Sequence, residues 1–467
     1  MRGPDLEWED PTTRPLHGQQ DRRSSPVTTG TSSTAAALLT AVIVLLVHAG
    51  GLVSVPLARV DLFWPTQVAI LLVALALGAS ARAWRHRPVV AFVLFWVVVW
   101  LWMPYALRVA PDAGWAHREM ESLAWSALSS LGALCVGVRG GPTGWRAGWL
   151  LGLALTGSIG VWELTTGNHL WVTPERPWPF RGTVAAATYI NPNNFGIVLL
   201  SMLVATLAWR ASVRHRGGRL LLAFAAVFAS AMALASQSRA AALGLAVILG
   251  LEALRWYHTL HVDVRGLLSR HRRVALSATV AGLILVAASF LVPGLAARNP
   301  VAAMLYAAAQ PETGASDAFR IRLIRLALGY AADSGFLGTG AGSFEPIMWK
   351  DAHSGIDIEA NLHNAFVELL MQYGAVVAVM LGMVMIVVLA AWWRSGPGSD
   401  ARPPFDVLRT ELLGHLVVFT ALGCTASSSL ALPVWWLMLA QVCATASVLP
   451  PRRHVRPVHA VSAARTR

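Results

Sequence analysis

The sequence contains little charge, almost no lysine and only three cysteines. Charged residues make up 13% of its 467 residues, against about 25% in soluble domains. Hydrophobic residues make up 55%, and the mean hydropathy is +0.55. This composition excludes an ordinary soluble domain and indicates a polytopic membrane protein.

The cysteines, Cys135, Cys424 and Cys443, fall within apolar runs and have no metal-ligand spacing. They are therefore predicted to be inert thiols buried in the core. The 20 tryptophans are predicted to lie in the aromatic belts at the two bilayer interfaces.

Twelve apolar runs are each close to the ~20 residues that a helix needs to cross a bilayer. They are residues 35–53, 62–80, 88–107, 120–138, 145–162, 191–209, 219–236, 239–254, 274–292, 364–392, 407–428 and 431–449. The polar residues 1–34 predict a disordered cytoplasmic tail, and residues 451–467 a second, basic tail. The expected fold is all-α, with a membrane domain over residues 35–450.

The distribution of basic residues predicts the orientation in the membrane. If the N-terminus is cytoplasmic, 26 of the 37 Lys and Arg residues fall on the inner tails and connections. Because inner loops are enriched in Arg and Lys, this asymmetry favours a multi-pass plasma-membrane protein with both termini in the cytoplasm. The net charge of +13 then reflects topology, so a nucleic-acid partner is excluded.

Two predicted outer loops are long enough to hold chemistry, residues 163–190 and 293–363. The second contains apolar residues at helical spacing, which predict a helix along the membrane interface with Asp317 as its N-cap. The residues of this apolar face are Phe319, Leu323, Leu326 and Tyr330.

Arg320, Arg322 and Arg325 lie in the same predicted helix. Together with His363 they form a cationic cluster at the mouth of an apolar bundle, which suits an anionic head group on a lipid tail. The alternative is that these arginines only contact lipid phosphates.

Four glycines follow within Gly335–Gly342. This stretch lacks the GK[ST] signature and the preceding strand of a phosphate-binding loop. It is therefore predicted to be a turn that packs the outer loop back onto the bundle.

His363 and Asn364 directly precede a long apolar run. At the N-terminal end of a helix the pKa of an imidazole is lowered, which favours the neutral form and makes His363 a candidate general base. A histidine that merely caps the helix is the alternative. Glu368, at membrane depth, is expected to orient His363 or Asn364, or to pair with an arginine.

Arg239 lies at the predicted outer junction of two spans and is flanked by small residues. An anion-binding role is favoured over snorkelling to the interface. Asn193 and Asn194 lie in the stretch NPNNFG, where Asn191 and Pro192 predict a turn and an N-cap for the following span. Capping alone is the alternative role of these asparagines.

The order of these motifs resembles the O-antigen ligase and Wzy-type polymerase superfamily. The resemblance covers about residues 180–390 and rests on short motifs in a fixed order. They are NPNNFG at 191–196, Ser238 and Arg239 before small residues, the Arg-led helix, GxGxGSF at 338–344, HNxxxE from His363, and Tyr373–Gly374. Gln372 stands where the family often has an acidic residue.

The resemblance implies a metal-independent, inverting glycosyltransferase of the GT-C type that needs no cofactor. Its donor would be a glycan on undecaprenyl diphosphate, and its acceptor a hydroxyl of a glycan or lipid. Arg239 and Arg320 match the family arginines that would hold the diphosphate, with Arg322 and Arg325 within one turn of that match. His363 matches the histidine that would activate the acceptor.

Other functions stay open at this point. Asp61 and Asp112 are isolated and no DxD-like pair occurs in an outer loop, which disfavours a metal-dependent sugar transferase. A lipid-linked oligosaccharide flippase is the main alternative, although such transporters usually show two related halves with broken helices at the midplane. A structural scaffold is a third possibility. The resemblance does not distinguish a ligase from a polymerase.

Overall fold

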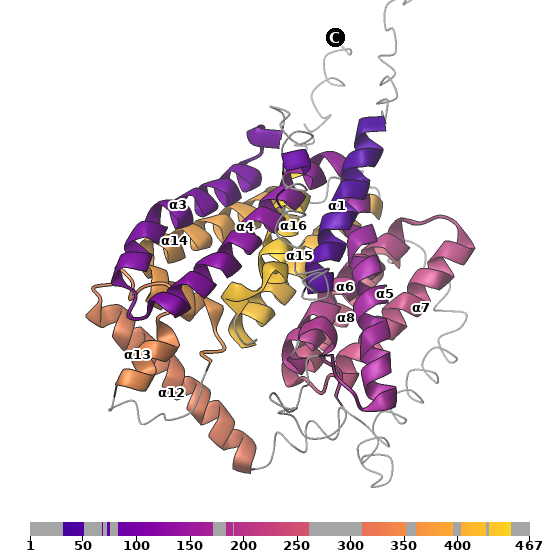
Figure 1. The fold of residues 1–467 in the computed structure, drawn as a ribbon. Helices are drawn as coiled ribbons and strands as arrows, with labels where there is room; N and C mark the ends of the chain where they lie inside the picture. Colours follow the sequence, from indigo (N-terminus) through magenta and orange to yellow (C-terminus); the bar gives the residue numbers. More distant parts are fainter. Residues whose placement is uncertain are drawn as a thin grey trace, which may run out of the picture.

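The computed structural model is a bundle of α-helices (Figure 1). It describes residues 31–50, 83–170, 184–189, 191–260, 311–351, 361–395, 403–425 and 429–449, with Val68 and residues 72–74, and no strand occurs in these ranges. The helices are α1 (Thr31–Ala49), α3 (Arg87–Val109), α4 (Ala113–Gly140), α5 (Pro142–Thr166), α6 (Pro192–Ser212), α7 (Arg216–Ala235), α8 (Arg239–Leu260), α12 (Pro311–Asp333), α13 (Phe344–Lys350), α14 (Ala365–Arg394), α15 (Pro403–Thr425) and α16 (Pro433–Ser447). Short 3-10 turns are η3 (Ala83–Arg85), η4 (Ala187–Tyr189) and η5 (Ser429–Ala431).

Ten of the twelve predicted spans correspond to helices in the described part of the chain. The other two, 62–80 and 274–292, lie outside the described residues except for Val68 and residues 72–74. The predicted tails also lie outside them, except that α1 already begins at Thr31. Within the described residues, seven helices are long and apolar enough to cross a membrane: α3, α4, α5, α6, α7, α14 and α15. The protein is thus an all-helical, multi-pass membrane protein, while the twelve spans, the large outer loop and the side of the termini stay predictions.

Helix α16 forms the centre of the bundle and packs against α15, α4 and α3. Its paired rings, Trp435 and Trp436, are fully buried, and Trp435 stacks on Phe419 with 4.6 Å between ring centroids. The indole N–H groups donate to the carbonyls of Phe419 and Leu430 at 2.8 and 2.9 Å. These hydrogen bonds let the indoles lie in the core.

The predicted aromatic belt is therefore wrong for the five tryptophans whose side chains are fully buried. These are Trp96, Trp145, Trp149, Trp435 and Trp436. The cysteine prediction also holds only in part. Cys443 is buried, but Cys135 is only partly buried and Cys424 is exposed, because it lies in the last turn of α15.

A buried ion pair ties three helices together. Arg146 on α5 contacts Glu411 on α15 at 2.6 Å, and its second terminal nitrogen donates to Ser212 at the end of α6 at 3.1 Å. Both side chains of the pair are less than one-tenth exposed. Removing one partner of such a pair would leave an uncompensated buried charge.

The glycine stretch packs against a break in α14, as predicted. Gly374 has φ +80° and ψ 179°, which interrupts the helix. The nearby amides of Thr339 and Gly340 donate to the carbonyls of Met371 and Gln372 at 2.8 and 3.0 Å. The break thus releases carbonyl groups that the glycine stretch then satisfies.

Close backbone contact explains why this joint needs glycine. A Cβ atom at Gly374 would lie 2.5 Å from the carbonyl carbon of Leu337, and one at Gly338 would lie 2.6 Å from the carbonyl oxygen of Gln372. Both glycines also have positive φ, a conformation that side chains with a Cβ rarely adopt.

Helix α12 presents the predicted apolar face to a small core of its own. Leu323 is fully buried there with Phe344 and Met348 of α13, and Phe319, Leu326 and Tyr330 pack around them. The helix begins at Pro311, so the prediction of Asp317 as N-cap is wrong. Proline fits the first turn of a helix, where its missing N–H is not needed.

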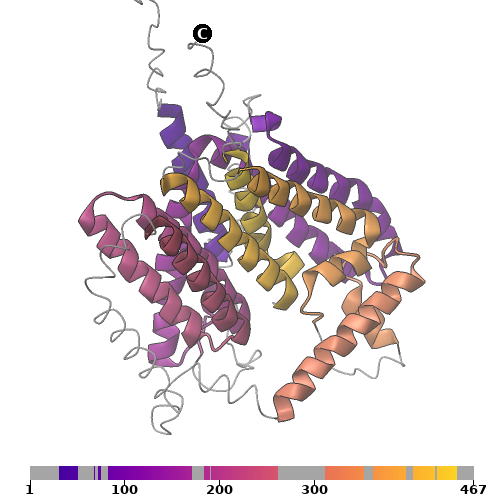
Figure 2. The same cartoon turned by 180° about the vertical axis from the view of Figure 1, so that it is seen from behind.

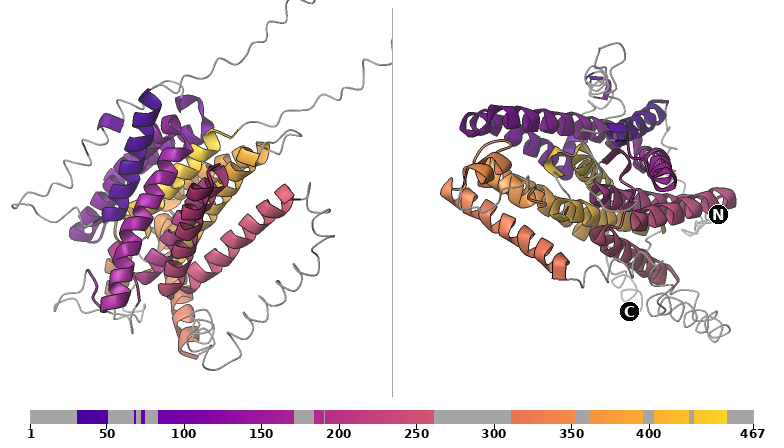
Figure 3. Two further views of the ribbon diagram at one scale, coloured as in Figure 1. Left: turned by 90° about the vertical axis from the view of Figure 1, so that its right-hand side faces the viewer. Right: turned by 60° about the horizontal axis from the view of Figure 1, so that its bottom comes forward.

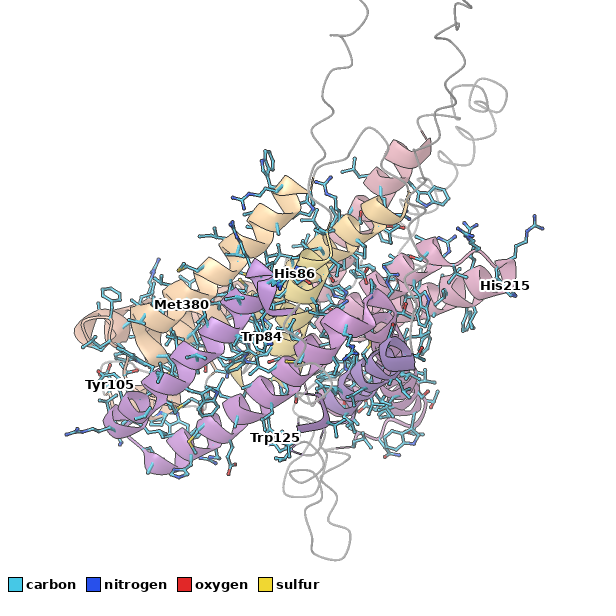
Figure 4. The ribbon with its side chains drawn as sticks, turned by 90° about the horizontal axis from the view of Figure 1, so that it is seen from above. Trp84, His86, Tyr105, Trp125, His215 and Met380 are labelled. Carbon is cyan, nitrogen blue, oxygen red and sulfur yellow. The ribbon has the colours of Figure 1, made fainter. Side chains whose placement is uncertain are left out.

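Helices α12 and α13 lie at one end of the bundle, beside the start of α14 (Figures 1 and 2). The turned views show α12 on the outside of the bundle (Figure 3). Seen from above, Tyr105 of α3 lies on one side of the bundle, and His215, which caps α7, lies on the opposite side (Figure 4). The functional groups predicted in the outer loop are therefore gathered at one end.

Candidate functional site

His363 occupies a constrained position just before α14. Its backbone is left-handed, with φ +54°, a conformation uncommon for residues other than glycine and typical of functional sites. Its N–H donates to the side-chain oxygen of Asn361 at 3.0 Å, and Asn364 caps α14 by accepting from the N–H of Val367 at 3.1 Å. Asn364 thus fixes where the helix begins and, with it, the place of His363.

Burial, and to a smaller extent the positive charge of Arg320, lower the pKa of His363 to about 4, while a hydrogen bond to the backbone of Thr425 acts in the opposite direction. His363 is therefore neutral near pH 7, and a neutral imidazole that donates through one ring nitrogen can accept through the other. The site joins the ends of α14 and α15 with the first half of α12.

The three arginines of α12 differ in their environment. Arg320 is partly buried and acts electrostatically on His363. Arg322 and Arg325 are exposed. Of the three, Arg320 is the one whose described interactions bring it to the histidine.

Arg239 is the first residue of α8. The hydroxyl of Ser238 caps that helix by accepting from the N–H of Ala241 at 3.2 Å, and the strained Gln237, with φ +55°, completes the turn from α7. This turn begins α8 where the sequence predicted a division between spans. Arg239 is partly buried there.

The asparagine turn packs directly against this junction. Asn191 caps α6, as predicted, by accepting from the N–H of Asn193 at 2.8 Å. Asn194 is buried and Asn193 partly buried. A Cβ atom at Gly196 would lie 2.2 Å from the hydroxyl of Ser236, so the start of α6 and the turn before Arg239 are in close contact.

A cavity of about 210 Å³ opens beside the start of α14. It lies between α4, α13, α14, η5 and the glycine stretch. Its polar and aromatic lining includes Trp115, Arg118, Glu119, Glu345, Glu368 and Gln372.

The expected partners of Glu368 were wrong. Its Oε1 accepts from Nε2 of Gln372 at 3.0 Å, and within the described chain its carboxylate pairs with neither His363 nor an arginine. Gln372 in turn accepts from the N–H of Gly342 at 2.9 Å. Gln372 lies four residues further along the same helix, so its amide is within reach of Glu368, whereas the side chain of Asn364 caps α14.

Two members of this acidic cavity, Glu119 and Glu345, were missed from the sequence. Glu119 lies just outside the apolar run 120–138, although α4 begins six residues before it, at Ala113. Asp112, an isolated loop residue in the sequence, is the N-cap of α4 and accepts from the N–H of Trp115 at 2.9 Å. This cap is the signal that would have extended the helix and placed Glu119 inside it.

Residues 224–382 match the family model for O-antigen ligase. This part of the chain is similar to the O-antigen ligases. The match supports a role in the synthesis of cell-surface polysaccharide. No curated protein matches the chain.

The ligase-related region runs from α7 to the middle of α14. It includes Arg239, the arginines of α12, the glycine stretch and His363. The asparagine turn and Glu119 lie outside it, on α6 and α4. The acidic cavity is thus formed jointly by the ligase-related region and by a helix that precedes it.

Proposed function

We propose that this protein is a glycosyltransferase that moves a glycan from an undecaprenyl-diphosphate-linked donor to an acceptor hydroxyl at the outer face of the membrane. The observation that carries the proposal is the position of His363. It is a neutral, partly buried imidazole beside Arg320, at the start of a long apolar helix and inside the ligase-related region. A lipid-linked anionic donor and a proton acceptor both suit such a place.

In the proposed reaction, His363 takes the proton of the acceptor hydroxyl as its oxygen attacks the anomeric carbon of the donor. The new C–O bond forms while the bond from that carbon to the diphosphate oxygen breaks, so the configuration inverts. The electron pair leaves with the lipid diphosphate. General-base assistance of this kind typically contributes about 10²–10⁴-fold in rate.

Arg320 and Arg239 are the proposed diphosphate ligands. Guanidinium groups bind phosphate oxygens in pairs and stabilise the charge that develops on the leaving group. Arg320 is supported by its proximity to His363, and Arg239 by its place at a helix start within the ligase-related region. The chemistry requires neither a metal ion nor a cofactor.

The proposal covers a ligase and a polymerase alike, because these differ in the acceptor. The acceptor is a lipid, or the end of another glycan. A lipid-linked oligosaccharide flippase remains the alternative, because it would bind the same donor.

Glycan transfer by the purified protein tests this proposal. The full-length protein in nanodiscs receives an undecaprenyl-diphosphate oligosaccharide, candidate acceptors and EDTA. We expect transfer by the wild type, and a loss of about 10²-fold or more in His363→Ala and Arg320→Ala.

Matched controls come from exposed residues near the same end of the bundle. His117→Ala removes an exposed imidazole from the first turns of α4, and Arg108→Ala an exposed guanidinium from the last turn of α3. Both should keep wild-type rates. Full activity in folded His363→Ala would refute the proposed base, and lipid movement across vesicles without any transfer would favour the flippase.

A further inference from the structure

The acidic cavity beside α14 is built differently from the site of the arginines. No residue that lines it belongs to α6, α7 or α8, the helices that carry the asparagine turn and Arg239. Its volume of about 210 Å³ is below the ~300–1,000 Å³ usual for drug-sized ligands. It therefore has room only for a small ligand, and that ligand need not be the diphosphate.

Two of its acidic side chains each have one oxygen without a hydrogen-bond donor among the described residues. Glu368 is only 8% exposed, and its Oε2 has no partner among the residues that the structure describes. The same holds for Oε1 of Glu119. Buried acceptors are nearly always satisfied in folded proteins, so these oxygens are suited to donors supplied by a ligand.

The direction of Glu368 is fixed by its neighbours. Gln372 holds Oε1 of Glu368, and the N–H of Gly342 holds Gln372. Both of these contacts lie within the joint between the glycine stretch and the break in α14. The remaining oxygen of Glu368 is thereby preorganised for a ligand, as supporting contacts do in functional sites.

The acidic groups of the cavity disfavour an anionic ligand. Glu119 and Glu345 act electrostatically on Glu368, so three carboxyl groups lie around one space, and their mutual repulsion keeps all three from being ionised together. Among the described lining residues, Arg118 is the cation, and it is stacked on Trp115 with 4.4 Å to the ring centroid. The ligand that fits is rich in donors and carries no negative charge.

We propose that this cavity binds a neutral sugar ring of the acceptor glycan, with its hydroxyl groups donating to Glu119 and Glu368. A sugar ring offers several O–H donors without charge, which matches the unsatisfied carboxylate oxygens. The assignment to the acceptor rests on the proposed function, in which the anionic donor head lies at Arg239 and Arg320.

One residue that lines the cavity contacts the backbone of the proposed base. Asn361 lines it, and the side chain of Asn361 accepts from the N–H of His363 at 3.0 Å. A sugar held by the carboxylates would therefore lie next to the residue that activates its hydroxyl.

Saturation-transfer NMR on the purified full-length protein tests binding without any donor lipid. The probes are neutral methyl hexopyranosides and the corresponding methyl uronosides. We expect saturation of the neutral glycosides only, and binding about tenfold weaker in Glu368→Gln, because an amide that keeps the bond to Gln372 presents an N–H₂ donor in place of the free acceptor oxygen. Ser122→Phe, which places a ring in the cavity, should abolish binding.

Glu252→Gln is the matched control, since it removes a carboxylate from α8, which does not line this cavity. It should bind like the wild type. Equal binding of uronosides, no binding of any neutral glycoside, or unchanged binding by folded Ser122→Phe would each overturn the inference.

Transfer kinetics then separate the acceptor from the donor. Ser122→Phe should raise the KM for the acceptor and leave the KM for the donor unchanged, and the reverse result would assign the sugar to the donor and overturn the inference. The two proposals fail separately. Sugar binding without transfer by the wild type would refute the proposed function alone, and transfer without sugar binding would refute the cavity alone.

Discussion

The pH dependence of transfer should report the environment of His363. Burial and the charge of Arg320 lower its pKa from 6.5 to about 4. Because the neutral form is the proposed base, kcat/KM should be level from about pH 5.5 upwards and fall only as the pH approaches 4. A free imidazole would lose activity already below about pH 6.5.

Replacing Arg320 by alanine should raise the pH at which kcat/KM falls on the acid side. The imidazole would lose a repelling charge, so its pKa would rise. Burial is the larger cause of the lowered value and Arg320 the smaller. Arg320 therefore accounts for the smaller share of the lowering, and the expected shift is on the order of one pH unit.

The assay is kcat/KM for transfer between pH 3.5 and 8, in wild type and Arg320→Ala, with Arg108→Ala as the control. The kcat/KM of Arg320→Ala will be lower at every pH, but the pH at which it falls does not depend on its absolute value. A fall of the wild-type kcat/KM near pH 6.5, or a fall at the same pH in Arg320→Ala as in the wild type, would refute the proposed role of a buried histidine beside this arginine.

Two further predictions concern stability. Gly374→Ala should lower the melting temperature of the purified protein strongly, since a Cβ atom there would lie 2.5 Å from the backbone of Leu337. Gly382→Ala in the same helix is the control, because a Cβ atom there has no neighbour within 4 Å, and it should be neutral or slightly stabilising. Equal melting temperatures for the two variants would refute the close packing of the glycine stretch against the break in α14. Arg146→Met should destabilise by about 3–5 kcal/mol, because it leaves Glu411 buried and unpaired, and adding Glu411→Leu should recover much of the loss. Additive losses in a thermal double-mutant cycle would contradict this account.

The sequence predicted the helical elements well because apolar length and periodicity are local properties. The division between α7 and α8 was predicted from three residues, Gln237 to Arg239, and the apolar face of α12 from spacing alone. The burial of Trp435 and Trp436 was not predictable in this way. Whether an indole faces lipid or the core depends on which helix is central, and no local pattern records that.

The site was predictable where a residue stands at a helix end. Asn191 and His363 could be placed because caps and starts follow from short motifs. Glu119 could not, because its role depends on α4 meeting α13 and α14 in space. Glu368 was found but given the wrong partners, since the amide of Gln372 one turn further on was not considered.

The break in α14 connects motifs that look independent in the sequence. The glycine stretch needs the carbonyls that Gly374 releases, and the break needs the amides of the glycine stretch. Gln372 lies at this joint and bonds both Gly342 and Glu368. The side chain at this position must therefore accept from a backbone N–H and donate to a carboxylate at the same time, which an amide does and an ionised acid does not. An acidic residue at position 372 would keep the bond to Gly342 but lose the N–H₂ group that donates to Glu368. The glutamine thus suits a chain whose cavity already contains three carboxylates.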